Sequence, residues 1–135
     1  MLIIPARVWA QIAFEAESAY PEECCGALLG CGEVVELAAP MTNTSPTDRR
    51  NSYRIDPGEL LDACRRARDR GLRLAAIYHS HPECEPDFSA QDAARAYPWI
   101  RYLVLAVRDK RAGAARCFQC DGQAGGFKPA GFQII

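Results

Sequence analysis

Residues 74–81 read Leu-Ala-Ala-Ile-Tyr-His-Ser-His, an apolar run that ends in the only two histidines of this 135-residue chain. The apolar part predicts a buried strand over residues 72–78, with His79 and His81 directly after it. Alternate residues of an extended chain point to the same face, so both imidazoles can aim at one point. Because imidazole is a common zinc donor, the pair predicts a metal site at the end of this strand.

Ser89 and Asp92 follow the histidines, and their spacing allows two interpretations. Residues 89–92 read Ser-Ala-Gln-Asp, which is a capping-box pattern that would simply start a helix over residues 89–97, before Pro98. A carboxylate in a first helical turn is also rigidly placed, as a metal ligand must be. With Asp92 as third ligand the site would be an open-sided zinc site of the catalytic type. Ser89 would then cap through its backbone while its hydroxyl faces a substrate.

A hydrolytic zinc site also needs a general base. Zinc lowers the pKa of a bound water toward ~7, and a nearby carboxylate can then collect and return the proton. Glu22 and Glu23 are candidates because they stand just before the apolar run of residues 24–30. The same two acids would equally suit a charged junction between a helix and a strand. Spacing alone does not select among the 17 acidic residues of the chain.

The pattern along the chain predicts one domain over residues 1–135 with an α/β or α+β fold and a mixed sheet. Asp56 and the following Pro-Gly-Glu are a strong helix start, and Gly71 ends that helix. A turn at Cys31-Gly32 joins two short strands. The remaining predicted elements are a helix over residues 6–19, strands over 24–30, 33–38, 100–107 and 114–120, and a polar loop over 40–51.

Composition narrows the class of protein. With 49% hydrophobic and 24% charged residues, the chain is typical of a soluble globular protein. Its net charge of −1 gives no general attraction to nucleic acid or anionic membranes. No apolar run approaches the ~20 residues that span a bilayer, and the first residues lack the pattern of a signal peptide. We therefore expect a cytoplasmic protein without nucleic-acid or membrane partners, whose basic residues 65–70 form a solvated helix face.

The seven cysteines are an odd number, and we expect reduced thiols, several of them buried as small hydrophobic residues. Cys117 and Cys120 form a single C-x-x-C without a second pair to complete a structural zinc site. They fall on a predicted strand, where positions three apart face opposite sides. We therefore expect no metal there.

The spacing of these candidate residues resembles the JAMM (MPN-plus) metalloprotease family. That family has a distant Glu followed by H-[ST]-H-x7-S-x-x-D, and every position is filled here, by Glu23, His79-Ser80-His81, Ser89 and Asp92. Further segments are similar to the small bacterial members: residues 20–26 (Tyr-Pro-Glu-Glu-Cys-Cys-Gly), 53–57 (Tyr-Arg-Ile-Asp-Pro) and 77–82 (Ile-Tyr-His-Ser-His-Pro).

The resemblance implies a fold, a site and a reaction. The fold would be the cytidine-deaminase-like α/β architecture, a mixed sheet flanked by helices. His79, His81 and Asp92 would bind one Zn²⁺ per chain, leaving a fourth position for water. Glu23 would be the general acid/base, and Ser89 would stabilise the oxyanion. The reaction would be hydrolysis of an amide bond by a peptidase or isopeptidase.

The resemblance also implies a substrate class, the ubiquitin-like and sulfur-carrier proteins whose flexible tails end in Gly-Gly. Hydrolysis would release an amino acid such as cysteine from that tail or trim residues beyond it. Two glycines suit a narrow groove because no side chain obstructs the approach to the metal.

One residue departs from the pattern of the family, and a cysteine lies close to the predicted site. Phe88 stands where many members have Pro, which would alter the loop before Ser89 without removing a ligand. Cys84 lies in the same loop, where we expect an incidental thiol rather than a zinc competitor or an oxidation sensor.

Two other functions compete with hydrolysis. A non-catalytic MPN scaffold would usually lack a ligand, and none is missing here. Nucleobase deamination is rejected, because it expects H-x-E together with P-C-x-x-C, whereas Arg116 precedes this cysteine pair.

Overall fold

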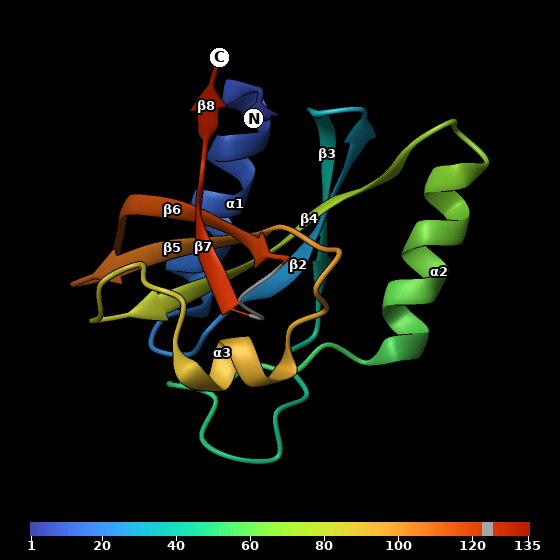
Figure 1. Cartoon of the computed structure of the whole chain (residues 1–135). Coiled ribbons are helices and arrows are strands. Elements are labelled where there is room, and N and C mark those ends of the chain that lie inside the picture. Colours follow the sequence, from blue (N-terminus) through green and yellow to red (C-terminus); the bar gives the residue numbers. More distant parts are fainter. Residues whose placement is uncertain (123–125) are drawn as a thin grey trace.

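The computed structural model describes residues 1–122 and 126–135, whose strands form one mixed sheet between helices (Figure 1). The sheet order is β7-β6-β5-β4-β2-β3-β1-β8. In chain order the elements are β1 (Leu2–Ile4), α1 (Ala6–Ala19), β2 (Cys25–Cys31), β3 (Val34–Met41), α2 (Pro57–Arg68), β4 (Arg73–Pro82), α3 (Ala90–Arg95), β5 (Tyr102–Arg108), β6 (Arg111–Asp121), β7 (Gly126–Ala130) and β8 (Phe132–Ile134).

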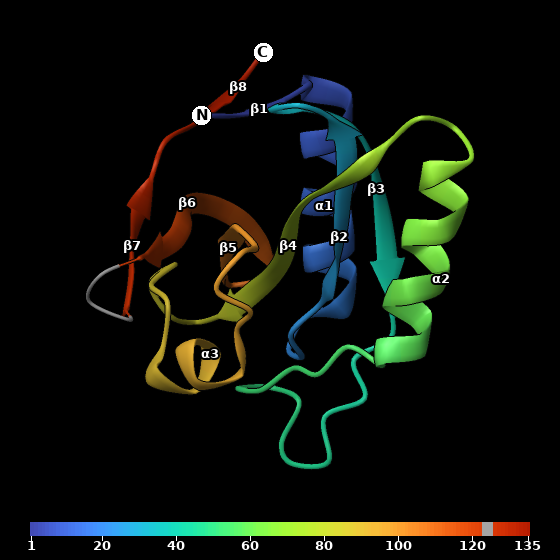
Figure 2. The ribbon, with the colours of Figure 1, turned by 45° about the vertical axis from the view of Figure 1, so that its right-hand side comes forward.

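Helices α1 and α2 cover opposite faces of this sheet (Figure 2). The buried residues of α1 recur at helical spacing, Val8, Ile12 and Ala16, and pack against Leu28 of β2 in the main core. The neighbouring Ala27 packs instead with α2 residues, because successive strand residues face opposite sides. The predicted α/β class with a mixed sheet flanked by helices is confirmed.

Strand β4 is longer than predicted and carries both histidines within it. The apolar run indicated an end at Tyr78, but β4 continues to Pro82. Pairing with β5 supplies the reason: β5 runs parallel to β4 as far as Pro82, so that His79 lies opposite Val104 and His81 opposite Ala106. On the other side β2 pairs with β4 as far as His79, opposite Cys25, so the His-Ser-His segment begins in the centre of the sheet.

Several boundaries differ from the sequence prediction. Strand β3 extends to Met41, into the segment expected as a loop, because it pairs along the whole of β2. Helix α3 ends at Arg95 rather than at residue 97. Strands β1, β7 and β8 were not predicted. Two of them have three residues each, and β1 and β8 pair with each other in parallel from opposite ends of the chain, which no local pattern encodes.

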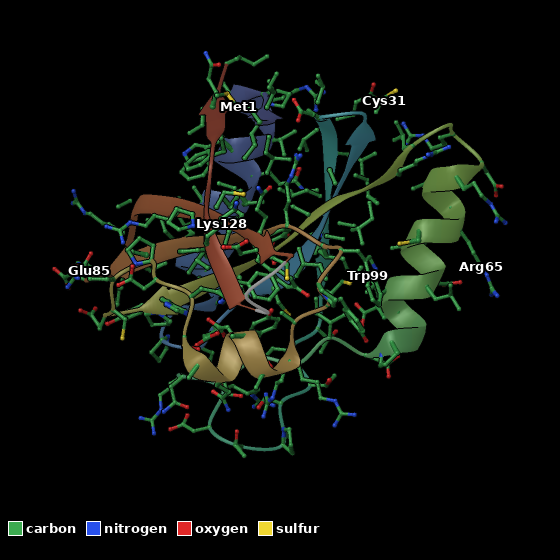
Figure 3. The ribbon with its side chains drawn as sticks, viewed as in Figure 1. Met1, Cys31, Arg65, Glu85, Trp99 and Lys128 are labelled. Carbon is green, nitrogen blue, oxygen red and sulfur yellow. The ribbon has the colours of Figure 1, made fainter. Side chains whose placement is uncertain are left out.

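The basic residues at the end of α2 and just after it face solvent, as expected. Arg65, Arg66, Arg68 and Arg70 are all exposed, and Figure 3 shows Arg65 pointing away from the sheet. Among the described residues, 1–122 and 126–135, no helix has the length and apolar character needed to cross a membrane.

Gly26 is required where β2 passes between β3 and β4. A Cβ atom at this position would collide with the Tyr78 side chain and lie 2.6 Å from the Ala39 backbone oxygen. We therefore expect Gly26→Ala to lower the free energy of unfolding by about 2 kcal/mol, within the usual range for overpacking a core. Urea unfolding would measure this, with Gly113→Ala as the matched control because nothing lies within 4 Å of its added Cβ. Equal stability of the two variants would contradict the packing argument.

Candidate metal centre

Three separate parts of the chain bring the predicted site residues together. His79 and His81 lie on the same face of β4, and Asp92 lies in the first turn of α3. Glu23 stands just before β2, which pairs with β4 so that Cys25 lies opposite His79. All four side chains are buried, although each is polar or charged.

Ser80, between the histidines, joins β4 to the segment that carries Glu23. Its hydroxyl accepts a hydrogen bond from the Cys24 backbone N–H at 2.8 Å, and its own N–H donates to the Cys24 carbonyl at 3.1 Å. Ser80 is completely buried, so these bonds hold Glu23 close to the histidines in a water-free environment. Sequence reasoning assigned Ser80 no role; the available signal was a hydroxyl residue fixed between two candidate ligands.

The two histidines and Asp92 form a compact triangle of potential ligand atoms. The Nε2 atoms of His79 and His81 are 3.2 Å apart, and Asp92 Oδ2 lies 3.1 Å from the first and 3.2 Å from the second. Ligand atoms bound at 2.0–2.1 Å to a tetrahedral zinc ion lie about 3.3–3.4 Å from one another. The triangle is thus within a few tenths of an ångström of the size that zinc requires, and its two nitrogens and one carboxylate oxygen are suitable donors.

Glu23 is a fourth potential ligand beside this triangle. One of its carboxylate oxygens lies within 4.8 Å of ligand nitrogens of both histidines, so Glu23, His79 and His81 alone also form a possible metal-binding group. Asp92 Oδ2, however, lies 3.1 Å and 3.2 Å from the two Nε2 atoms, whereas Glu23 Oε1 makes no hydrogen bond within the described residues. Asp92 is therefore the carboxylate that contacts both rings directly.

Different contacts orient the two imidazole rings. His81 Nδ1 is 3.0 Å from the Glu85 carbonyl, which fixes the proton on Nδ1 and leaves Nε2 free to bind a cation. His79 Nδ1 has no hydrogen-bond partner among the described residues. Instead the Tyr53 ring stacks on the His79 ring, with centroids 4.3 Å apart and planes inclined by 22°. Packing therefore restrains the His79 ring, while a hydrogen bond restrains that of His81.

Burial and close contacts shift the pKa values of this group, and the shifts of His79 and Asp92 favour cation binding. Burial lowers the pKa of His79, so the ring is neutral and offers a lone pair. Burial would raise the pKa of Asp92, but hydrogen bonds with His79 and His81 outweigh it and hold this pKa well below its usual range. For His81, burial is outweighed by its bonds to Asp92 and Glu85, and its pKa is raised.

Burial is also the largest influence on the pKa of Glu23. Burial raises its pKa to about 8, with the negative charge of Asp92 adding to the effect and His81 opposing it. Its Oε1 atom is buried and has no hydrogen-bond partner in residues 1–122 and 126–135. A buried unpaired carboxylate oxygen is costly, and a cation nearby would offset this cost by favouring the charged form.

Ser89 caps α3 through its hydroxyl oxygen, as the capping-box interpretation predicted, and not only through its backbone as the metal-site interpretation assumed. The hydroxyl oxygen accepts from the Asp92 N–H at 2.9 Å, while Asp92 Oδ2 accepts from the Ser89 N–H at 3.0 Å. This capping box and the metal-ligand geometry therefore coexist in the same two residues. Since its oxygen is the acceptor, the Ser89 hydroxyl keeps its own proton for donation to another group.

A cleft of about 430 Å³ opens beside the site. Glu23, His81, Ser89 and Cys84 all line it. Cys84 is exposed in this cleft as a free thiol. Phe88, before Ser89, lies in a cluster of aromatic rings, with its ring centroid 5.4 Å from that of Phe118.

Comparison with known proteins supports the interpretation of the sequence. The model of a family described as prokaryotic homologs of the JAB domain matches residues 5–121. A desampylase from Haloferax volcanii is 36% identical over 87 residues, 63% of this chain and 61% of that protein. A probable TtuB-protein conjugate cleaving protease from Thermus thermophilus is 35% identical over 92 residues, 68% of this chain and 61% of that protein. The matched segment thus spans about three fifths of both relatives.

Solved structures share the fold. A protein from Desulfitobacterium hafniense superposes with a TM-score of 0.82 at 24% identity, covering 100% of this chain and 93% of that one. A JAB1/MPN domain protein from Archaeoglobus fulgidus superposes with a TM-score of 0.67 at 15% identity, covering 100% and 99%. At these identities the structures show a common JAB/MPN-type architecture.

Proposed function

Because this chain belongs to the family of prokaryotic homologs of the JAB domain, we propose that it is a zinc-dependent hydrolase of amide bonds. The observation that carries the proposal is the triangle of His79, His81 and Asp92, whose ligand atoms are 3.1–3.2 Å apart. These residues would hold one Zn²⁺ per chain. A bound zinc ion would polarise the scissile carbonyl and lower the pKa of water.

Glu23 would move the proton during hydrolysis. Its carboxylate lines the cleft, is buried, and lies beside the histidines. In this role it accepts a proton from the attacking water and delivers that proton to the amine that leaves. Its buried setting keeps bulk water from competing for the proton.

Ser89 would stabilise the negative charge that develops on the carbonyl oxygen. Its hydroxyl oxygen is already engaged by the Asp92 N–H, which orients the side chain before substrate binds. The free hydroxyl proton can then donate to the oxyanion, a contact that is strong in a site with little water. The hydrogen bond of the cap thus orients the Ser89 hydroxyl for donation to the oxyanion.

The substrate we propose is a ubiquitin-like or sulfur-carrier protein, cleaved at its C-terminal Gly-Gly tail. The Thermus relative is named for the cleavage of TtuB-protein conjugates, which supports a protein conjugate as substrate. Two glycines present no side chain to the cleft that Ser89 and Glu23 line, so the backbone of the tail can approach these residues closely.

A direct test uses two forms of a small sulfur-carrier protein, one extended by a single cysteine after Gly-Gly and one joined through Gly-Gly to a lysine side chain. We expect the zinc-loaded protein to shorten at least one of them at the glycine, seen by intact mass as a single defined loss. Chelator treatment should abolish the loss, and added zinc should restore it. If both carriers remain intact with zinc bound, the proposed substrate class is wrong.

A further inference from the structure

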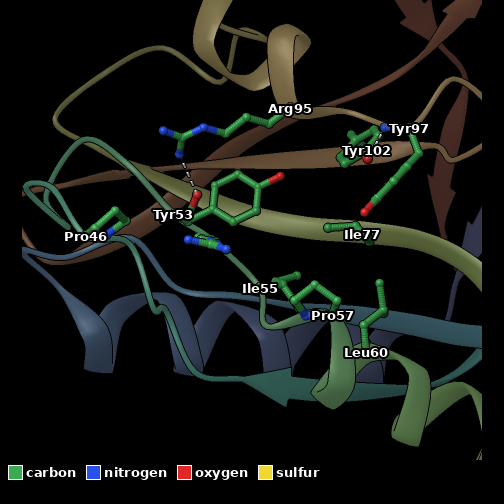
Figure 4. A pocket seen from close by; sticks show the side chains of 10 residues that line it. Pro46, Tyr53, Ile55, Pro57, Leu60, Ile77, Arg95, Tyr97 and Tyr102 are labelled. Carbon is green, nitrogen blue, oxygen red and sulfur yellow. Dashed lines mark hydrogen bonds between the residues drawn. The ribbon is translucent and has the colours of Figure 1, made fainter.

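A second cavity of about 410 Å³ lies on the other side of Tyr53 from the metal centre. Tyr53, Ile77, Tyr97 and Tyr102 contribute apolar and aromatic surface to it (Figure 4). None of the residues that line the cleft of Glu23 and Ser89 lines this cavity, so the two spaces are separate. We call it the Tyr53 pocket.

A single aromatic ring, that of Tyr53, separates the Tyr53 pocket from the metal centre. The ring of Tyr53 forms its wall and also stacks on His79 at 4.3 Å. In Figure 4 the hydroxyl groups of Tyr53 and Tyr97 point into the space between them. The Tyr53 hydroxyl makes no hydrogen bond within the described part of the chain and is free to meet a ligand.

Two arginines give this apolar pocket a positive charge. Arg95 donates to the Ser52 hydroxyl and to the Tyr53 carbonyl, a bond drawn in Figure 4, and so holds the Tyr53 segment against α3. The Arg54 side chain makes no hydrogen bond, and neither arginine has a carboxylate partner within residues 1–122 and 126–135. A guanidinium remains charged at all working pH values, so the pocket favours an anionic ligand.

We propose that the Tyr53 pocket binds the carrier segment just before the Gly-Gly tail, and that it selects an apolar or aromatic residue next to an acidic one. This proposal rests on the proposed function. The leaving amine must reach Glu23, so the leaving group belongs in the cleft that Glu23 lines. The carrier then extends the opposite way, past His79 and Tyr53.

The length of the tail agrees with this placement. Two extended glycines span about 7 Å, enough to pass one aromatic ring from the scissile carbonyl. The residue before them then arrives at the Tyr53 pocket, where the tyrosines can pack against its side chain. Arg54 and Arg95 can pair with a carboxylate on the same segment or on its neighbour.

The test compares two tails on the same carrier, one with Glu-Phe and one with Lys-Phe before Gly-Gly. We expect the acidic tail to be cleaved about fivefold faster at low salt, as for a partly exposed ion pair, and the preference to shrink in high salt. Arg54→Glu should abolish or reverse this preference. Arg65→Glu makes the same charge change on the exposed face of α2, and this variant should prefer the acidic tail as strongly as the wild type does.

A binding measurement distinguishes an error in the proposed role of the pocket from an error in the proposed enzymatic function. Fluorescence anisotropy of labelled peptides ending in Glu-Phe-Gly-Gly and Lys-Phe-Gly-Gly reports on the pocket even without turnover. Tighter binding of the acidic peptide, lost in Arg54→Glu, would support the pocket even if no carrier were cleaved. Equal binding of both peptides would overturn the proposal, and so would a preference for the acidic peptide that persists in Arg54→Glu. It would also be overturned if cleavage depended only on the residues after Gly-Gly.

Discussion

Replacing Glu23 by glutamine is expected to leave zinc bound while reducing kcat for tail cleavage about a thousandfold, within the range for removing a general acid/base. The amide has nearly the same shape as the carboxylate but does not accept and return a proton. Glu23 is not part of the 3.1–3.2 Å triangle, so the proposed ligands are unchanged in the variant. Elemental analysis and single-turnover kinetics on the same sample would measure both effects.

Glu22→Gln is the matched control because it makes the same chemical change one residue earlier. Glu22 is 45% exposed and pairs with Arg49 on the surface, 3.4 Å away. We expect this variant to retain wild-type kcat and zinc content. If Glu23→Gln cleaved at the wild-type rate, another group would have to move the proton; if it lost zinc, Glu23 would be a ligand.

Asp92→Ala is expected to reduce zinc affinity by at least about a hundredfold, because removing even an outer contact of a metal site can cost 10–100-fold. Loss of the carboxylate leaves two imidazoles 3.2 Å apart and no anionic donor in the triangle. Competition with a chromogenic chelator would give the affinity, and tail cleavage should fall with zinc occupancy.

Two controls separate the ligand role of Asp92 from its role in the helix cap. Ser89→Ala also breaks the capping box of α3 but keeps all three proposed ligands, so zinc should remain while kcat falls. Asp56→Ala removes the cap of α2, where Asp56 accepts from the Glu59 N–H at 3.0 Å. It should cost about 1 kcal/mol of stability, with no change in zinc affinity.

The contrary results are informative as well. If Asp92→Ala retained zinc at wild-type affinity, the alternative group of Glu23, His79 and His81 would have to bind it, and Glu23→Ala would then release the metal. A wild-type protein that binds no zinc would reduce Ser89 and Asp92 to a helix cap. The non-catalytic scaffold would then be the better description.

Much of the fold could be predicted because its signals are local. Helix α2 begins after Asp56 as its cap and proline indicated, and α1 occupies residues 6–19 as its apolar spacing indicated. The missed strands are those whose partners lie far away in sequence. β8 is defined by its pairing with β1, and residues 132–134 carry no pattern of their own that reveals it.

By itself, the sequence determined the chemistry available to this protein: two histidines on one strand face, Ser89 and Asp92 at a helix start, and an acid before a strand. These features depend on the periodicity of an extended chain and on capping, both of which act over a few residues. Spacing could not establish that Asp92 reaches the histidines or that its capping bond to Ser89 survives in the site. Only the tertiary structure decided this, by placing the first turn of α3 so that Asp92 Oδ2 lies within 3.2 Å of both rings.

The tertiary structure alone also placed Tyr53 on His79 and gathered Arg54 and Arg95 around an aromatic pocket. Tyr53 and Arg54 come from the segment before α2 and Arg95 from the end of α3, and no local pattern links these two segments. Contacts between distant segments are chosen by burial and shape across the whole sheet, because each must offset the entropy of ordering the chain between them. The residues of the proposed reaction could therefore be named from the sequence, while the pocket proposed to select the substrate exists only in the folded chain.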